Sequence, residues 1–452
     1  MREGALVRAL LLPAIALMCA PWSACAGAEA PPQRPMMKDF MGICGHFPFN
    51  GPTYAPVAGL VRNYHSLRWD LDVAKPYVDP PYPFAPNGVN WEDLYGGWRR
   101  AGFTIDACIM WDDYKPQEWV TPEQSAHSYG KVFARFLGPS GKDLVTVAEL
   151  GNEPGKYSDE QFTAVAHALA LGLKEGDPRM RVATANLSLG KGDDYSKSIK
   201  CYEGWWDLVD ILNVHSYAMM GAWPNERRTH PEDPACAYLT TVRDLLAWRD
   251  ANAPGKPVWV TEFGWDAHRA EGAPLEVGVP IHDRPSTVSR VQQAQYLLRS
   301  YLIFARMGVD RACMFWFQDD GAQKGLFSAC GIISKGVKQP AYYAMASLRR
   351  NLGDYGSCMA LTEEPGGVYA YRFDSGKDRA CVAAWSPTRD GEPRTCRIAL
   401  DAAGLSGFAF VRAVEPAVSE SGDRAVEVSV ADGAAVLQAT GMPRLVFFER
   451  KR

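Results

Sequence analysis

This 452-residue sequence lacks blocks of like charge and common metal-binding motifs, and it has no long apolar run after its N-terminal segment. Beyond its first twenty residues, no stretch approaches the about 18 uninterrupted apolar residues typical of a membrane-spanning helix. Basic residues number 48 against 52 acidic ones, and no basic stripe occurs. No CxxC or HExxH pattern is present. The sequence therefore predicts no membrane insertion, no nucleic-acid partner, and no metal or other cofactor.

The composition is that of a soluble globular protein that can bury a sizeable core. Hydrophobic residues make up 47% of the chain and charged residues 22%, with a formal net charge of −4. The chain is longer than one ordinary domain, so a large domain with a smaller companion is expected.

The N-terminal segment has the layout of a secretory signal peptide. Two arginines precede a short apolar run, and small residues follow as far as Ala26 and Ala28. We expect cleavage near one of these alanines, which makes residues 1–28 a signal and the mature protein secreted or periplasmic. A lipid anchor on Cys25 is a weaker alternative, because Trp22 stands where such signals carry an aliphatic residue.

Nine of the eleven cysteines follow this segment, and an odd number cannot pair completely within one molecule. Export permits disulfides, and two pairs are conceivable, Cys201 with Cys236 and Cys381 with Cys396. The cysteines inside expected strands are predicted to be plain buried thiols: Cys44, Cys108 and Cys313.

An apolar stretch from Asp143 to Leu150 ends on Gly-Asn152-Glu153-Pro154. The apolar residues suit a parallel strand covered on both faces, and the proline cannot continue it because it donates no ladder hydrogen bond. A carboxylate at the end of such a strand indicates a catalytic site. A turn tripeptide that arose by chance is the alternative.

A second stretch, from Lys256 to Trp265, repeats the order of short apolar strand followed by a carboxylate, here Glu262. Two carboxylates at two strand ends suggest one site. Together the motifs resemble the clan of retaining glycoside hydrolases built on a (β/α)8 barrel. In that clan the acid/base follows an Asn at the end of strand four, and the nucleophile ends strand seven.

The chain can be divided into eight strand-then-helix units, which predict an α/β protein with a parallel sheet closed into a (β/α)8 TIM barrel over residues 38–350. The expected strands are residues 39–45, 64–70, 104–110, 144–150, 181–186, 209–217, 256–265 and 311–317. From residue 355 onward, alternating segments separated by Gly, Asp and Ser predict a small C-terminal antiparallel β-sandwich over 355–452.

The resemblance implies that Glu153 is the acid/base and Glu262 the nucleophile of a double displacement. It also implies that Asn152 hydrogen-bonds the sugar's 2-hydroxyl. The alternatives are two structural carboxylates and a turn-forming asparagine.

Four further residues are implied to bind the substrate or support the nucleophile. His215 and Tyr217 match a His-x-Tyr pair at strand six, and strand alternation puts them on the same side. Arg68 matches an arginine at strand two whose charge favours the nucleophile's carboxylate form. Trp316 matches an aromatic platform beneath the sugar. For Arg68 the alternative is an ion pair elsewhere in the barrel, and for the other three residues it is packing in the core. The exit loops carry other candidate rings: Trp111, Trp119, Trp223 and Trp265.

The sequence therefore predicts a metal-independent retaining glycoside hydrolase that cleaves O-glycosidic bonds of a poly- or oligosaccharide, with carboxyl groups about 5 to 5.5 Å apart. A catalytically inactive carbohydrate-binding protein on the same scaffold is the main alternative. A metal-dependent barrel hydrolase is a third, but it needs clustered histidines, and the first strand leads only to His46. The sugar, the linkage, endo or exo action and the oligomeric state stay open.

Overall fold

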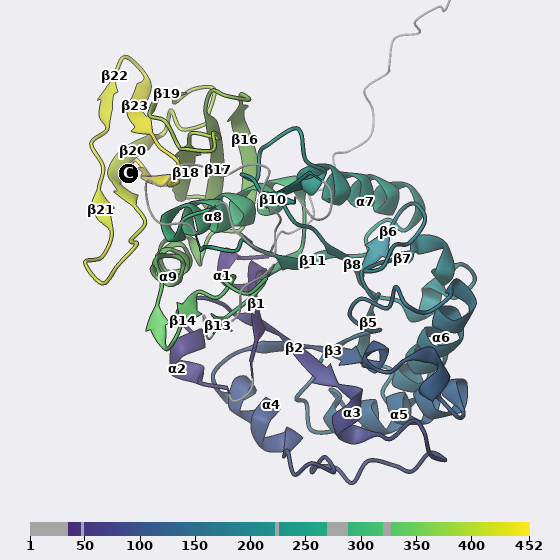
Figure 1. Cartoon of the computed structure of the whole chain (residues 1–452). Coiled ribbons are helices and arrows are strands. Elements are labelled where there is room, and N and C mark those ends of the chain that lie inside the picture. The colour runs from purple at the N-terminus through teal and green to yellow at the C-terminus, as the bar shows by residue number, and fades with distance from the viewer. Residues whose placement is uncertain (1–34, 47–48, 222–225, 269–287, 320–326) are drawn as a thin grey trace, which may run out of the picture. The chain divides into compact units, whose positions relative to one another are not determined.

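Eight parallel strands alternate with helices along most of the chain, and a set of antiparallel strands follows (Figure 1). The computed structural model describes residues 35–46, 49–221, 226–268, 288–319 and 327–452. The predicted signal segment and Trp223 lie outside these ranges. The eight parallel strands are β1 (Met41–Gly45), β2 (Leu60–Ser66), β3 (Thr104–Met110), β4 (Val147–Glu149), β5 (Arg181–Ala183), β8 (Leu212–His215), β11 (Val258–Phe263) and β12 (Arg311–Met314).

These strands close into a barrel. Their order in the sheet is β5-β4-β3-β2-β1-β12-β11-β8, and a parallel bridge from Ala183 to Ile211 joins the two outer strands. Figure 1 shows the strands around a common centre with helices outside them. The expected (β/α)8 fold is confirmed, and the carboxyl ends of all eight strands meet at one mouth.

The helices outside the barrel begin and end where local sequence signals favour it. Asn90 accepts a hydrogen bond from Asp93 N–H at the start of α4, and Ser158 with Gln161 forms a capping box at α6. At α5 the residues Thr121-Pro-Glu-Gln124 have the pattern of a capping box, but the box does not form, and the Thr121 hydroxyl contacts Ser125 instead. The helices are α4 (Trp91–Arg100), α5 (Pro122–Leu137), α6 (Asp159–Gly176), α7 (Tyr238–Asn252), α8 (Arg290–Met307) and α9 (Pro340–Leu352).

Side chains from six of the strands fill the inside of the barrel below its mouth. They form a small hydrophobic cluster, separate from the main core between strands and helices: Cys44, Leu60, Val147, Ala183, Ile211, Trp259 and Cys313. The predicted buried thiols Cys44, Cys108 and Cys313 are all fully buried. No helix in the described part of the chain is both long and apolar enough to cross a membrane.

The antiparallel strands after α9 form two sheets, as predicted. One sheet has the order β16 (Ser357–Glu363), β17 (Tyr369–Ser375), β18 (Arg379–Trp385), β24 (Arg444–Arg450), β20 (Phe408–Glu415), β21 (Arg424–Ala425), and the other has β19 (Arg394–Ala399), β23 (Ala434–Ala439), β22 (Ser429–Ala431). The predicted boundary at residues 350–355 covers the end of α9 and the turn before β16, and the division into two domains stays a prediction.

A buried polar cluster links the sandwich to the loops and helices of the barrel. Arg299 on α8 pairs with the Glu232 carboxylate, which also accepts a 2.7 Å hydrogen bond from the Trp385 indole on β18. Arg299 donates in addition to the Thr388 carbonyl at 3.0 Å. Because all these groups are bonded, the junction has a defined geometry.

Two expectations about local structure are wrong. Strand two begins at Leu60 rather than at residue 64, because residues 60–66 pair in register with β3. Residues 67–70 form the helical turn α3 (Leu67–Asp70), in which Asp70 accepts hydrogen bonds from His65 and Trp91.

The two conceivable disulfides do not form. Cys381 packs in the main core, whereas Cys396 packs in the core between the two sheets, so their side chains point to different sides. Cys201 and Cys236 are also thiols, the first in the 3-10 helix η3 (Ile199–Tyr202) and the second before α7.

Candidate active site

A sharp bend after β4 places Asn152 and Glu153 at the barrel mouth. Gly151 makes the bend with φ of +98°, a conformation that other residues rarely adopt. The Asp112 carboxylate, at the exit of β3, accepts the N–H of Asn152 at 3.1 Å and that of Glu153 at 2.8 Å. The backbone that carries both side chains is therefore held from the neighbouring strand.

A bulge in β11 brings Glu262 opposite His215. Val260 pairs with Val214 of β8, but the next pair is Glu262 with His215, so β11 carries one extra residue here. The extra residue, Thr261, bonds the Asn213 amide. Bulges of this kind redirect side chains at barrel rims, and this one turns Glu262 into the mouth.

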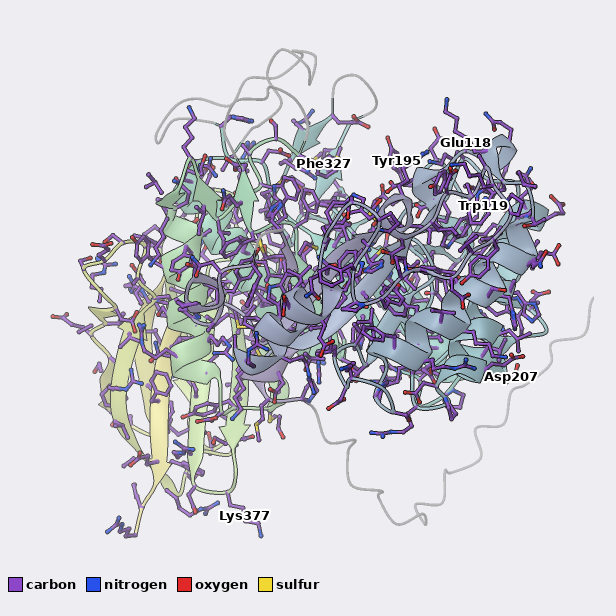
Figure 2. The ribbon with its side chains drawn as sticks, turned by 90° about the horizontal axis from the view of Figure 1, so that it is seen from below. Glu118, Trp119, Tyr195, Asp207, Phe327 and Lys377 are labelled. Carbon is purple, nitrogen blue, oxygen red and sulfur yellow. The ribbon has the colours of Figure 1, made fainter. Side chains whose placement is uncertain are left out.

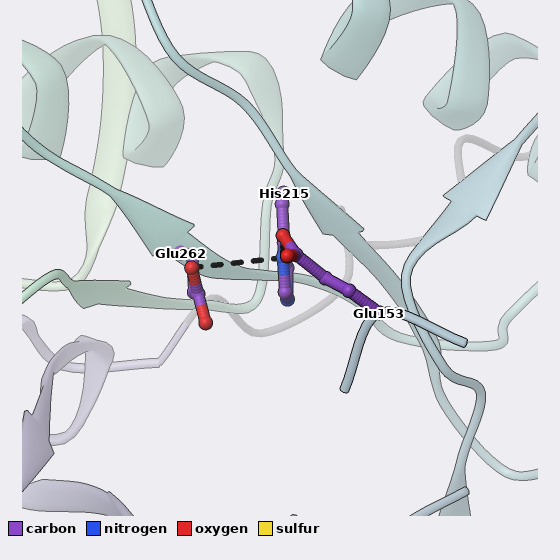
Figure 3. A group of neighbouring side chains, drawn as sticks. All are labelled: Glu153, His215 and Glu262. Carbon is purple, nitrogen blue, oxygen red and sulfur yellow. Dashed lines mark hydrogen bonds and ion pairs between the residues drawn. The ribbon is translucent and has the colours of Figure 1, made fainter. Parts of the chain in front are cut away.

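His215 lies beside the carboxylates of Glu153 and Glu262 and is close to both (Figure 3). Its Nδ1 is 3.0 Å from Glu153 Oε1 and 3.7 Å from Glu262 Oε2. One oxygen of each carboxylate and this nitrogen all lie within 4.8 Å of one another. On the other side of the ring, Arg62 Nη2 lies 3.5 Å from His215 Nε2.

Both oxygens of Glu262 accept hydrogen bonds. Oε1 accepts from Arg62 Nη1 and from the Tyr64 hydroxyl, and Oε2 accepts from the Tyr217 hydroxyl, each at 2.7 Å. Burial raises the pKa of Glu262, but His215, Arg62 and the two phenols lower it more, so the pKa lies below its usual range. Glu262 is therefore an anion at neutral pH.

Arg62 is the centre of this network and was not identified from the sequence. Fully buried, its guanidinium forms a double contact with Glu149 and donates to Asn152 Oδ1 at 2.9 Å as well as to Glu262. Since Oδ1 of Asn152 accepts this bond, its Nδ2 is the group left to donate elsewhere.

A signal for Arg62 exists in the sequence. Arg62 and Tyr64 are two residues apart, so they point to the same face of any strand that contains both. The strand expected from the sequence begins at residue 64 and therefore does not include Arg62.

The predicted position of Arg68 beside the nucleophile is wrong. Arg68 lies in the helical turn α3, where it pairs with Glu118 at 3.1 Å and stacks on the Tyr114 ring. Figure 2 shows Glu118 well apart from Phe327, whose ring contacts Tyr217 at the site. Arg62 makes the contact with Glu262 that was expected of Arg68.

Trp316 follows β12 and is partly buried at the mouth. It stacks on Phe315 at 4.9 Å between ring centres and meets His46 edge to face at 4.0 Å. The structure thus brings Asn152, His215 and Tyr217 together with both glutamates and places Trp316 after the eighth strand. Of the other candidate rings, Trp111 and Trp265 are buried core residues, Trp119 is nearly so, and Trp223 lies outside the described residues.

Among the described residues, one group could hold a metal ion: Glu153, His215 and Glu262. The surroundings fit a cation poorly. Glu262 already accepts three hydrogen bonds, and the Arg62 guanidinium 2.7 Å away adds a fixed positive charge. The arrangement is better suited to two carboxylates that face each other across a bound molecule.

No protein-family model matches the chain, and no curated protein matches it. Solved structures do. A family 39 glycoside hydrolase from the gut symbiont Bacteroides cellulosilyticus WH2 matches with a TM-score of 0.65 and 18% identity, over 92% of this chain and 81% of that one.

Two further structures are similar over nearly their whole length. A glucosidase from Croceicoccus marinus has a TM-score of 0.59 and 16% identity over 93% of this chain and 98% of that one. AbfB, a family 51 alpha-L-arabinofuranosidase from Bifidobacterium longum, has a TM-score of 0.56 and 11% identity over 93% of this chain and 97% of that one. The chain therefore shares the (β/α)8 fold of these glycoside hydrolases.

Proposed function

We propose that the protein is a retaining glycoside hydrolase that cleaves O-glycosidic bonds of a poly- or oligosaccharide, with Glu262 as nucleophile and Glu153 as acid/base. The predicted signal segment makes it a secreted or periplasmic enzyme. No metal takes part in the reaction.

The spacing of the two carboxylates carries this proposal. Their nearest oxygens lie within 4.8 Å, which supports direct attack by one carboxylate on the sugar. Retaining enzymes hold their carboxyl groups about 5 to 5.5 Å apart, whereas inverting enzymes need about 6.5 to 9.5 Å to admit a water.

In the first step the ionised Glu262 attacks the anomeric carbon, and the bond from that carbon to the leaving oxygen breaks. Glu153 gives its proton to this oxygen, so the leaving group departs as an alcohol. The sugar is then an ester of Glu262. Tyr64 and Tyr217 hold the attacking carboxylate, and burial raises the pKa of both phenols well above the usual value, so they remain donors.

In the second step Glu153, now ionised, takes a proton from a water that attacks the anomeric carbon. The ester bond to Glu262 breaks, and the carboxylate returns to its hydrogen bonds. Two inversions give a product with the configuration of the substrate.

Asn152 is placed to bind the sugar beside the attacked carbon. Its Oδ1 is occupied by Arg62, so Nδ2 can donate to the 2-hydroxyl, a contact that strengthens as the transition state forms. Trp316 offers a partly buried aromatic face for the C–H groups of the sugar.

A mechanism-based label tests the assignment. A panel of aryl glycosides and polysaccharides first identifies a substrate. A 2-deoxy-2-fluoro glycoside of the same sugar with a good leaving group should then form a stable ester, which peptide mass spectrometry should locate on Glu262. Binding of the sugar without turnover or labelling would instead support the non-catalytic alternative.

A further inference from the structure

Three acidic or basic side chains form a buried layer below the proposed active site. Arg62 on β2, Asp106 on β3 and Glu149 on β4 are each fully buried inside the barrel. Arg62 and Asp106 are register partners on adjacent strands, and the Glu149 carboxylate lies against both. The proposed reaction gives no role to Asp106 or Glu149.

The charges of this layer and of Glu262, which shares Arg62 with it, do not balance if every group is ionised. Asp106, Glu149 and Glu262 would carry three negative charges against the single positive charge of Arg62. Buried charge without a partner is costly, so one of the three acids has to hold a proton.

Hydrogen bonding decides which acid holds the proton. Glu262 accepts from three donors, and Glu149 accepts from Nε and Nη2 of Arg62 at 2.7 to 3.0 Å. Among the described residues, no N–H donor and no hydroxyl reaches either oxygen of Asp106. A carboxylic acid has a donor of its own, and the Glu149 carboxylate beside it is the available acceptor.

We infer that Asp106 is a neutral carboxylic acid at the working pH of the protein, and that its O–H donates to Glu149. Glu149 is thereby fixed against Arg62, and Arg62 is directed at Glu262 and Asn152. Asp106 is then a positioning residue for the nucleophile, and this consequence rests on the proposed glycosidase function.

The electrostatic surroundings agree with a neutral Asp106. Burial, followed by the Glu149 charge, raises the pKa of Asp106 well above its usual range, and Arg62 and Arg181 offset this only in part. The titratable groups that influence it come from several elements: Arg62 on β2, Cys108 on β3, Glu149 on β4, Arg181 on β5, Cys313 on β12 and Tyr95 on α4.

Infrared spectroscopy tests the protonation without any substrate. The difference spectrum of wild type minus Asp106→Asn at neutral pH should contain the carbonyl band of a protonated carboxylic acid, shifted in heavy water. Absence of the band, with ionised carboxylate bands in its place, would overturn the inference. This readout stands even if the protein hydrolyses no glycoside.

Kinetics test the positioning role. Asp106→Asn keeps a donor for Glu149 and the same charge, so kcat should stay within about threefold and the acidic limb of the pH profile should not move. Asp106→Ala loses the donor, and kcat should fall about tenfold with little change in KM. A folded Asp106→Ala with wild-type kcat would overturn the positioning role.

Glu149→Gln is the matched control for removal of a buried anion from this layer. Without the Glu149 charge, the positive charge of Arg62 stabilises the Glu262 carboxylate more strongly. The pKa of Glu262 should therefore fall, and the acidic limb of the pH profile should move to lower pH. The same movement in Asp106→Asn would mean that Asp106 is ionised, contrary to the inference.

Discussion

The ends of β4 and β11 each deliver a glutamate to the same site but surround it differently. The Glu262 side chain is 6% exposed and accepts hydrogen bonds from Arg62, Tyr64 and Tyr217. The Glu153 side chain is 28% exposed and is bonded to the His215 imidazole. The first is fixed by strong donors on a bulged strand, and the second stands at a bend beside solvent.

This difference matches the two parts that a double displacement requires. A nucleophile has to stay ionised and aimed at one carbon, and buried charge-assisted hydrogen bonds accomplish both. An acid/base has to give up and regain a proton in each cycle, which contact with solvent permits. In the proposed reaction, two identical side chains thus acquire different chemistry from their surroundings.

The largest expected effect is that of Glu262→Gly. Loss of the attacking carboxylate should lower kcat by at least about 10⁴-fold. Added azide can enter the space and should yield a glycosyl azide of inverted configuration, detectable by NMR. Glu203→Gly, at an exposed glutamate with φ of −60°, is the control and should be fully active. Wild-type activity of Glu262→Gly would end the assignment.

Glu153→Ala should have an effect that depends on the leaving group. Glycosides of poor leaving groups need protonation and should react about 10² to 10⁴ times more slowly, whereas activated aryl glycosides need little and should be less affected in the first step. A plot of log(kcat/KM) against leaving-group pKa should therefore be steeper than for wild type. An equal loss for every substrate would argue against an acid role.

Tyr217→Phe and Tyr64→Phe should have smaller effects with a defined direction in pH. Each removes a hydrogen bond that lowers the pKa of Glu262, so the pKa rises and the acidic limb of kcat/KM moves to higher pH. A hydrogen bond to a charged group contributes about 1.5 kcal/mol or more, which corresponds to a loss of about tenfold. Tyr195→Phe, at an exposed ring, is the control. A limb that moves to lower pH would contradict the account.

The smallest effect on activity is expected in the sandwich. Trp385→Phe removes the hydrogen bond to Glu232 but leaves the Arg299 pair. The free energy of unfolding in urea should fall by about 1 to 3 kcal/mol, while kcat/KM stays within about twofold. Lost activity at unchanged stability would instead give the sandwich a part in catalysis.

The sequence was sufficient to predict the eight parallel strands and to place two glutamates at strand ends on the barrel mouth, whereas their catalytic roles stay a prediction. Each glutamate follows a short apolar strand, and eight strand-helix units leave few ways to arrange a parallel sheet. The predicted third strand, residues 104–110, has the bounds of β3.

The sequence alone could not show that Arg62, and not Arg68, contacts Glu262. The partners of Arg62 come from β4 and β11, at sequence distances of 87 and 200 residues, and no local pattern encodes such contacts. Residues 60–70 contain one arginine inside β2 and one just after it, and only the register with β3 decides that the first faces inward. The bulge that aims Glu262 is likewise a property of pairing between strands.

The stereochemistry of hydrolysis tests the central claim most directly. Proton NMR can follow the anomeric signal of the first product formed, before mutarotation, from any aryl glycoside that the protein cleaves. The account predicts that this product has the anomeric configuration of the substrate, because Glu262 attacks first and water second. Initial release of the opposite anomer would show that water attacks directly, and would contradict the covalent role of Glu262.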